Sequence, residues 1–146
     1  MSEKTYLITG ITGMVGSHLC DLLLRDPEAR IFGFCRWTSS LRNLSDAFAY
    51  IKSHQIDDRL NLIYGDLCDP VTLTKALEIA QPDFIFHLAA QSFPKASFDQ
   101  FNTTYVTNVT GTHYLLDAAT RIVPNARIHV CSSSEVFGKV SRDHIP

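Results

Sequence analysis

The sequence predicts an α/β protein built on a doubly wound parallel sheet. Short apolar runs alternate with longer helical patterns along its 146 residues, and Gly10, Gly13 and Gly16 punctuate the change from the first apolar run to the first helical pattern. This alternation is typical of parallel strands joined by crossover helices. Because such crossovers are right-handed, we expect the strand order 3-2-1-4-5 and a ligand crevice at the carboxyl ends of the strands, where that order reverses.

Five apolar runs predict buried strands. They occupy residues 6–9, 31–35, 60–64, 84–88 and 128–131. Each is short and bounded by polar or turn-forming residues, as expected for strands of a covered parallel sheet. The fifth strand should lie at the edge of the sheet, with unpaired backbone groups that another chain could pair with.

The first two helices follow from apolar spacing. Between the first two strands, apolar residues recur every three or four positions and should form the buried face of a helix: Val15, Leu19, Leu22 and Leu23. The pair Asp26-Pro27 ends this helix, because proline disfavours its continuation. A second helix is expected within residues 44–53.

The next two helices have clearer signals. Asp69 supplies an N-cap and Pro70 a favourable first-turn residue, so a helix should run from there until Gln81-Pro82. A longer helix is predicted over residues 101–122. Gly111 stands in its middle at a cost of about 1 kcal/mol relative to alanine, which suggests close packing against a neighbour. One face of this helix should carry Val109, Leu115, Leu116 and Ala119.

Composition limits the class of protein. With 45% hydrophobic residues and a net charge of −2, the chain can bury one ordinary core, and residues 1–146 are expected to form a single domain. The mild negative balance offers no basic surface, so we do not expect a nucleic-acid partner. Because no apolar stretch resembles an export signal or a membrane span, we expect a cytoplasmic protein without a membrane partner.

The cysteine pattern indicates neither a metal site nor a disulfide scaffold. The four cysteines are widely scattered and contain no CxxC pair. We therefore expect no bound metal and predict buried, reduced thiols at Cys20, Cys35, Cys68 and Cys131.

The glycine-punctuated turn has the spacing Gly-x-x-Gly-x-x-Gly between a strand and a helix. Glycines let the backbone turn tightly and approach a phosphate, while exposed N–H groups and the positive end of the following helix attract negative charge. The sequence therefore predicts that this turn binds the pyrophosphate of a dinucleotide. The predicted cofactor-binding residues are Gly10, Ile11, Thr12, Gly13, Met14, Val15 and Gly16.

The end of the second strand bears on the choice of coenzyme. Arg36 stands where an NAD-specific protein usually presents an acidic residue to the ribose hydroxyls. A guanidinium pairs well with the additional phosphate of NADP, so we expect NADP as the cofactor. Arg42, or the hydroxyls of Thr38, Ser39 or Ser40, could share this contact, and the alternative is that Arg36 is a solvated surface arginine.

Polar and small residues follow the third and fourth strands at the same predicted edge. Asp66 and Leu67 come after the third strand, where Asp66 could instead cap the next helix. After the fourth strand, two alanines leave room for an adenosine and its ribose to lie across the backbone. This second group of predicted cofactor contacts comprises Leu88, Ala89, Ala90, Gln91 and Ser92.

A candidate catalytic pair follows the fifth strand. In an extended backbone, Ser133 and Glu135 would face the same side, because side chains alternate. A hydroxyl can orient a substrate, and a neighbouring carboxylate can also move a proton on and off carbon. The alternative is a capped loop without a catalytic role.

Together these motifs resemble the extended branch of the short-chain dehydrogenase/reductase superfamily, which has a Rossmann-type fold, and within it the GDP-mannose 4,6-dehydratases. The segments that carry the resemblance are residues 10–13, 88–92, 95–99 and 133–140. The resemblance implies NADP-dependent oxidation of a nucleotide sugar at C4, removal of the C5 proton, loss of water from C6 and reduction at C6.

The resemblance also implies individual residue roles. Ser133 would hold the O4 region of the substrate, and Glu135 would be the acid/base for C5 deprotonation and water loss. Asp66 would bond the adenine amino group, and Leu67 would pack on the adenine ring. The chain departs from the family pattern at Trp37, where a second arginine is common, and at the helix position of Asn108, where the family has a carboxylate.

A catalytic Tyr-x-x-x-Lys pair, typical of this superfamily, would follow Glu135 beyond Pro146. We therefore expect the amino-terminal, NADP-binding part of a larger dehydratase, incomplete on the carboxyl-terminal side of its sheet and inactive alone, whose full-length form is a homo-oligomer. Related alternatives are a sugar-nucleotide epimerase, reductase or decarboxylase. An alternative of another class is a non-catalytic NADP-binding regulatory module.

Overall fold

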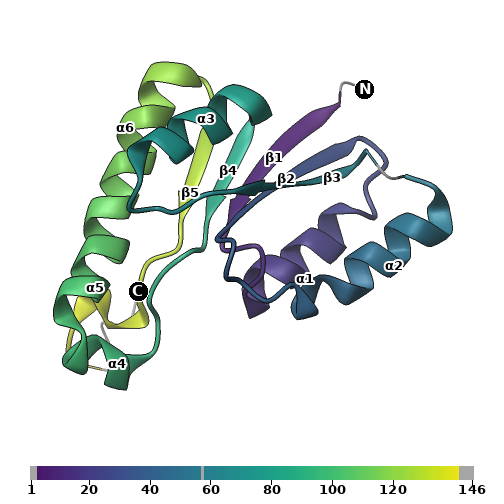
Figure 1. The fold of residues 1–146 in the computed structure, drawn as a ribbon. Helices are drawn as coiled ribbons and strands as arrows, with labels where there is room; N and C mark the ends of the chain where they lie inside the picture. Colours follow the sequence, from purple (N-terminus) through teal and green to yellow (C-terminus); the bar gives the residue numbers. More distant parts are fainter. Residues whose placement is uncertain (1–2, 57, 142–146) are drawn as a thin grey trace.

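The computed structural model describes residues 3–56 and 58–141. Its strands are β1 (Lys4–Thr9), β2 (Ala29–Cys35), β3 (Leu60–Tyr64), β4 (Phe84–His87) and β5 (Arg127–Val130). All neighbouring pairs are parallel, and they form one sheet in the order β3-β2-β1-β4-β5 (Figure 1). The predicted doubly wound α/β fold and its strand order are confirmed. The order reverses between β1 and β4, so a crevice is expected at their carboxyl ends.

Helices cover the sheet on both faces, as Figure 1 shows. On one face lie α1 (Met14–Leu23) and α2 (Ser45–His54), and on the other lie α3 (Pro70–Ala80) and α6 (Gly111–Ile122). The chain adds β2 and β3 on one side of β1 and then crosses to add β4 and β5 on the other side. Because all the crossovers are right-handed, this reversal places their helices on opposite faces of the sheet.

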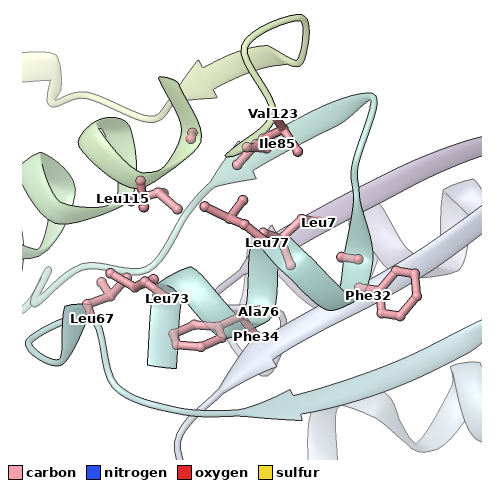
Figure 2. Packing of buried hydrophobic residues seen from close by; sticks show 13 residues of the cluster. Leu7, Phe32, Phe34, Leu67, Leu73, Ala76, Leu77, Ile85, Leu115 and Val123 are labelled. Atoms are coloured by element: carbon pink, nitrogen blue, oxygen red, sulfur yellow. The ribbon is translucent and has the colours of Figure 1, made fainter. Parts of the chain in front are cut away.

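Alternating strand residues supply two separate cores. Leu7 of β1 and Ile85 of β4 face the α3 and α6 side, where Figure 2 shows them with Leu77 and Leu115. Ile8, the next residue of β1, belongs to the core beneath α1 and α2. Because both faces of β1 and β2 are buried, the carboxyl ends of these strands are held in fixed relation to each other.

The ends of α3 match the sequence prediction. The Val71 N–H donates to Asp69 Oδ1 at 2.9 Å, Pro70 is the first helical residue, and the helix stops at Gln81, whose φ is 41°. Side-chain capping and a left-handed residue after the last turn are the ordinary means of satisfying helix termini.

The buried face of α1 differs from the prediction. Val15 and Leu22 are exposed, whereas Gly16, Ser17 and Cys20 are buried. Gly16 packs against the backbone of Gly10 and Ile11 in the glycine turn, so α1 faces the protein with its small residues. Val15 and Leu22 consequently point to the surface.

The segment between β4 and β5 is more broken than the single helix predicted over residues 101–122. It contains α4 (Pro94–Asp99), α5 (Phe101–Tyr105) and a π-helical turn, η2 (Val106–Thr110), before α6 begins. The wider turn changes the phase of the helix, and Val109 is consequently exposed instead of buried with Leu115.

Gly111, the first residue of α6, packs closely against a neighbour as predicted. A Cβ at this position would lie 2.8 Å from the Cβ of Leu67, which follows β3. This contact joins α6 to the loop after β3.

Two further burial predictions are wrong. β5 is mostly exposed, because it has only one strand neighbour and the described residues place no helix over its second face. Cys20 and Cys35 are buried free thiols, but Cys68 and Cys131 are exposed because both follow the ends of strands.

None of the helices in residues 3–56 and 58–141 combines the length and hydrophobicity needed to cross a bilayer.

Candidate functional site at the carboxyl edge of the sheet

The glycine turn brings three backbone segments into contact. Gly10 has a φ of +71°, and a Cβ there would lie 2.8 Å from both the Cα and the N of Ala89. A Cβ on Gly16 would lie 2.7 Å from the Cα of Ile11. The turn, the start of α1 and the segment after β4 therefore approach one another at distances that side chains would prevent.

The glycine turn leads into the first turn of α1, where backbone N–H groups come before the first hydrogen bond of the helix. Gly13 is the N-cap residue and supplies no side-chain acceptor, and its own N–H donates to the Gly10 carbonyl at 2.9 Å. The Ser17 N–H donates to the Gly13 carbonyl at 3.0 Å. The N–H groups of residues 14–16 lie before this bond, at the positive end of the helix, where an anion is favoured.

The side chains of the turn divide between core and surface. Ile11 is fully buried in the core under α1, and a Cβ on Gly33 of β2 would meet its methyl groups. Met14 and Val15 are exposed. Ile11 would therefore meet a cofactor through its backbone, whereas the exposed pair lies at the surface of the turn.

Asn43 holds the turn from the loop after β2, a role that sequence reasoning missed. Its Nδ2 donates to the Thr12 carbonyl at 2.9 Å. Asn43 belongs to η1 (Arg42–Leu44), which precedes α2. No local sequence pattern indicates this contact, because it joins residues 31 positions apart.

Arg36 is exposed immediately after β2. Its neighbour Trp37 stacks on Tyr64 of β3, with ring centroids 3.9 Å apart and planes 10° apart, and remains 78% exposed. The register pairs Cys35 with Tyr64, which places the two rings at the ends of adjacent strands. The aromatic residue that departs from the family pattern thus covers the end of β3 beside Arg36.

The loops after β2 and β3 converge near Cys68. Although Cys68 is exposed overall, the partial desolvation of its thiol is the main cause that raises the pKa, and a hydrogen bond with Asp66 acts in the same direction. Thr107 of η2, whose Oγ1 lies 4.0 Å from the Cys68 Sγ, and the Arg36 charge both act to lower this pKa. Asp66 and Thr107 of η2 therefore lie beside one thiol.

Asp66 does not cap α3, because Asp69 does. The Oδ1 of Asp66 instead accepts the Cys68 N–H at 2.9 Å within the loop, and its side chain stays exposed. Leu67 is only 5% exposed and lies in the core beneath Gly111. The predicted adenine contacts of Asp66 and Leu67 remain predictions.

The segment after β4 is fixed by hydrogen bonds to its backbone. Asn108 of η2 accepts the Gln91 N–H at 2.8 Å and donates to the Gln91 carbonyl at 3.0 Å. Leu88 and Ala89 are partly buried, whereas Ala90 and Ser92 are exposed. The amide that replaces a family carboxylate at Asn108 thus positions the predicted adenosine-binding segment.

A buried polar chain lies directly beneath this segment. Thr9 Oγ1 and His87 Nδ1 are 2.7 Å apart, and His87 Nε2 is 2.9 Å from Thr112 Oγ1 of α6. The Ala89 N–H donates to Thr9 Oγ1 at 3.3 Å. Sequence reasoning missed this chain, because Thr9 and His87 lie among the apolar residues of two predicted strands.

The candidate catalytic segment is not extended. After β5, residues Ser134–Phe137 form a 3-10 turn, η3, in which the Val136 N–H donates to the Ser133 carbonyl at 3.1 Å. The expectation that Ser133 and Glu135 share a side through strand alternation is therefore wrong. Both residues still follow β5 at the carboxyl edge of the sheet, and their catalytic pairing remains a prediction.

Two surface hollows lie away from the predicted cofactor residues. One is lined by Asp21, Leu24, Arg25, Asp46 and Tyr50, and the other by residues 81–83 and 122–126. The residues that the structure describes at the carboxyl edge define the candidate site by their backbone geometry and hydrogen bonds.

A doubly wound parallel sheet with a glycine turn packed against the segment after β4 defines the Rossmann-type class of α/β domain. The family model for GDP-mannose 4,6 dehydratase matches residues 7–146. The chain belongs to the GDP-mannose 4,6-dehydratase family, and the resemblance found in the sequence is confirmed.

Curated relatives agree with this assignment. The chain is 38% identical over 142 residues to GDP-mannose 4,6 dehydratase 2 of Caenorhabditis elegans, covering 94% of this chain and 37% of the relative. It is 37% identical to GDP-mannose 4,6 dehydratase of Drosophila melanogaster, with 94% and 35% covered. The chain therefore spans little more than a third of the length of these relatives.

Solved structures share the fold over nearly the whole chain. The Bordetella bronchiseptica enzyme WbmH, solved in complex with NAD+, has a TM-score of 0.75 and 25% identity, covering 93% of this chain and 41% of that protein. UDP-N-acetylglucosamine 4-epimerase from Methanobrevibacter ruminantium M1 has a TM-score of 0.79 and 24% identity, with 100% and 43% covered. The second similarity shows the fold alone.

Proposed function

We propose that this chain is the NADP-binding part of a nucleotide-sugar 4,6-dehydratase that acts on a GDP-hexose. The observation that carries the proposal is the contact between the Gly10 turn and the Ala89 backbone at the point where the strand order reverses. Family membership supports the substrate class and the reaction.

The residues of the turn fit a pyrophosphate. Alanine-sized side chains at Gly10 and Gly16 would collide with the backbone of Ala89 and Ile11, so glycine at both positions allows the turn to pack closely on the start of α1 and the segment after β4. The N–H groups of residues 14–16 supply donors at the positive end of α1. The coenzyme bound there would accept a hydride from the sugar and return it.

Arg36 would select NADP over NAD. It is exposed directly after β2, at the carboxyl edge of the sheet, so it is available to a phosphate there. Trp37, which stands where a second arginine is common, stacks on Tyr64 and carries no charge. Arg36 is therefore the cation that directly follows β2. A guanidinium offers two parallel donors to a phosphate.

The proposed chemistry uses Ser133 and Glu135. The Ser133 hydroxyl would hold the O4 region of the sugar. Once C4 is a ketone, the C5 hydrogen becomes acidic enough for an ordinary carboxylate, so Glu135 would take that proton and then deliver it to the oxygen that leaves C6 as water. The proton removed from carbon is thus returned to the leaving group.

The proposal includes two further family properties. A cytoplasmic location and a homo-oligomeric full-length form are expected for this chain. The solved epimerases share the fold without deciding the reaction, because a common fold hosts several reactions. Glu135 favours a dehydratase over most epimerases.

Calorimetric titration with NADP and with NAD tests the cofactor assignment. We expect NADP to bind at least about tenfold more tightly than NAD, and Arg36→Ala to weaken NADP binding by about 10- to 100-fold while changing NAD binding little. Arg25→Ala, which removes an exposed arginine after α1, is the matched control. Preference for NAD, or equal effects of the two variants, would refute the assignment.

The chemical assignment has a separate test. Glu135→Gln should leave NADP affinity unchanged, because the substitution removes charge from the catalytic carboxylate and not from the cofactor turn. In any form of the protein that converts GDP-mannose, the variant should lose exchange of the C5 hydrogen with solvent. Normal exchange and turnover would show that the carboxylate is incidental.

A further inference from the structure

We propose that His87 is a positioning residue that, as the neutral Nε2–H tautomer, ties the backbone after β4 to β1 and α6. The inference rests on the proposed function in one respect, namely that this backbone forms part of the cofactor site. His87 ends β4 and pairs in register with Thr9, which ends β1. Both side chains are buried, at 3% and 0% exposure.

The donors and acceptors along the buried series of hydrogen bonds assign the tautomer of His87. The Thr112 hydroxyl donates to the Asn108 carbonyl at 2.7 Å, and a carbonyl can only accept. Thr112 Oγ1 has then no hydrogen left for His87, so the contact of 2.9 Å requires His87 Nε2 to carry the proton.

The other ring nitrogen completes the chain. Thr9 Oγ1 accepts the Ala89 N–H at 3.3 Å and still has its own hydrogen to donate. That hydrogen meets the lone pair of His87 Nδ1, 2.7 Å away, if this nitrogen is unprotonated. In the neutral Nε2–H form every member of the chain is therefore satisfied.

Protonation of the ring would break this arrangement. With both nitrogens protonated, Nδ1–H would donate to Thr9 Oγ1, and the Thr9 hydroxyl hydrogen would lose its acceptor in a fully buried position. Burial already lowers the pKa of His87, and the described residues contribute no charge to that shift. The neutral ring is favoured both by burial and by the hydrogen-bond pattern.

Charged and titratable side chains stand on each of the elements around the ring. Tyr6 faces the opposite side of the sheet, where it stacks on Phe84, and Asp117 pairs with Arg121 on the surface of α6. The remaining groups on β1, β5, α3 and α6 are Lys4, Arg127, His129, Lys75, Glu78, His113 and Tyr114, the last of which packs against the core under α3 and α6. None of these causes the shift at His87.

The consequence for the site is mechanical. Thr9 immediately precedes Gly10, Ala89 packs on Gly10, and Asn108 holds Gln91 through its side chain while accepting Thr112 through its carbonyl. His87 thus links the two backbone segments that would lie against the coenzyme to the start of α6. A change in the ring would shift their relative positions.

Nuclear magnetic resonance of the chain labelled with ¹⁵N-histidine tests the tautomer directly. Signals that disappear in His87→Gln identify the ring. We expect a protonated Nε2 and a bare Nδ1 that persist when the pH falls well below about 6.5, the ordinary histidine pKa. A protonated Nδ1 in the neutral ring, or titration at the ordinary value, would overturn the inference whether or not a cofactor binds.

The positioning role is tested by NADP affinity. Thr112→Val removes the acceptor of the His87 proton at nearly constant shape and should weaken NADP binding about 3- to 10-fold. Thr120→Val is the matched control, because among the described residues the Thr120 hydroxyl donates to the carbonyl of Asp117 in its own helix and not to the segment after β4. Equal affinities for the two variants would refute the role, whereas failure of the unmodified chain to bind NADP would refute the proposed function and this role together.

Stability against pH gives a second signature of the lowered pKa. An unfolded histidine takes up a proton below about 6.5 and the buried ring does not, so stability contributed by the neutral ring is lost as the pH falls below that value. The His87→Gln variant, which keeps one donor and one acceptor, should lack this part of the acid sensitivity. Equal acid sensitivity in both proteins would contradict the assignment.

Discussion

Replacing Gly10 with alanine should destabilise the fold strongly, because two penalties coincide there. Gly10 has a φ of +71°, and a side chain in that conformation costs roughly 1–2 kcal/mol. The added Cβ would lie 2.8 Å from the Cα and N of Ala89, whereas ordinary contact begins at 3.4 Å. Overpacking of this kind costs about 1–3 kcal/mol, so the expected total is about 2–5 kcal/mol.

Gly138 offers a matched control for the first penalty. Its φ is +64°, but a Cβ there would meet nothing within 4 Å. Gly138→Ala should therefore cost only roughly 1–2 kcal/mol. The difference between the two variants isolates the contact between the glycine turn and the segment after β4.

Urea denaturation of the two variants and of the unmodified chain measures both costs. We expect Gly10→Ala to lower the free energy of unfolding by about 1–3 kcal/mol more than Gly138→Ala. The same variant should also lose NADP affinity, because the turn must move away from Ala89. Equal losses of unfolding free energy would refute the reasoning, since they would show that the Ala89 backbone yields without cost.

Three further predictions concern the core, the segment after β4 and a buried thiol. Leu77→Ala should lower the unfolding free energy by about 2–5 kcal/mol, against less than about 0.5 kcal/mol for the exposed Ile79→Ala; similar losses would contradict the assigned core. Asn108→Ala should cost about 1–3 kcal/mol and Asn102→Ala, exposed on α5, nearly nothing, and the reverse order in urea denaturation would be evidence against the clamp on the segment after β4. Burial, with a smaller effect of the nearby Asp21 charge, raises the pKa of the Cys20 thiol from 9.0 to about 12. Cys20 should therefore contribute stability that is lost as the pH rises from 9.0 to about 12, and thermal melts of Cys20→Ala should show a smaller loss over this range than those of the unmodified chain.

The sheet could be predicted from the sequence because its strands are short apolar runs and its crossovers have one hand. The buried face of α1 could not, because periodicity assumes that bulky residues such as Leu22 point inward. The helix instead contacts the Gly10 turn through Gly16 and Ser17, and small residues give no apolar signal. Similarly, η2 widens the helix before Gly111 and moves Val109 out of the predicted face.

Some parts of the candidate site could be predicted from the sequence and others could not. The glycine turn is visible in the sequence because its spacing reflects local backbone geometry. Asn43, His87 and Asn108 are not, because their hydrogen bonds join segments that only the tertiary fold brings together. The expected alternation of Ser133 and Glu135 failed because a 3-10 turn begins directly after Ser133.

A crystal structure of the chain with NADP would locate the coenzyme. We expect the pyrophosphate to lie against the N–H groups of residues 14–16, beside Ala89, with the additional phosphate at Arg36. A coenzyme bound elsewhere, or a phosphate turned away from Arg36 with the glycine turn vacant, would contradict this expectation.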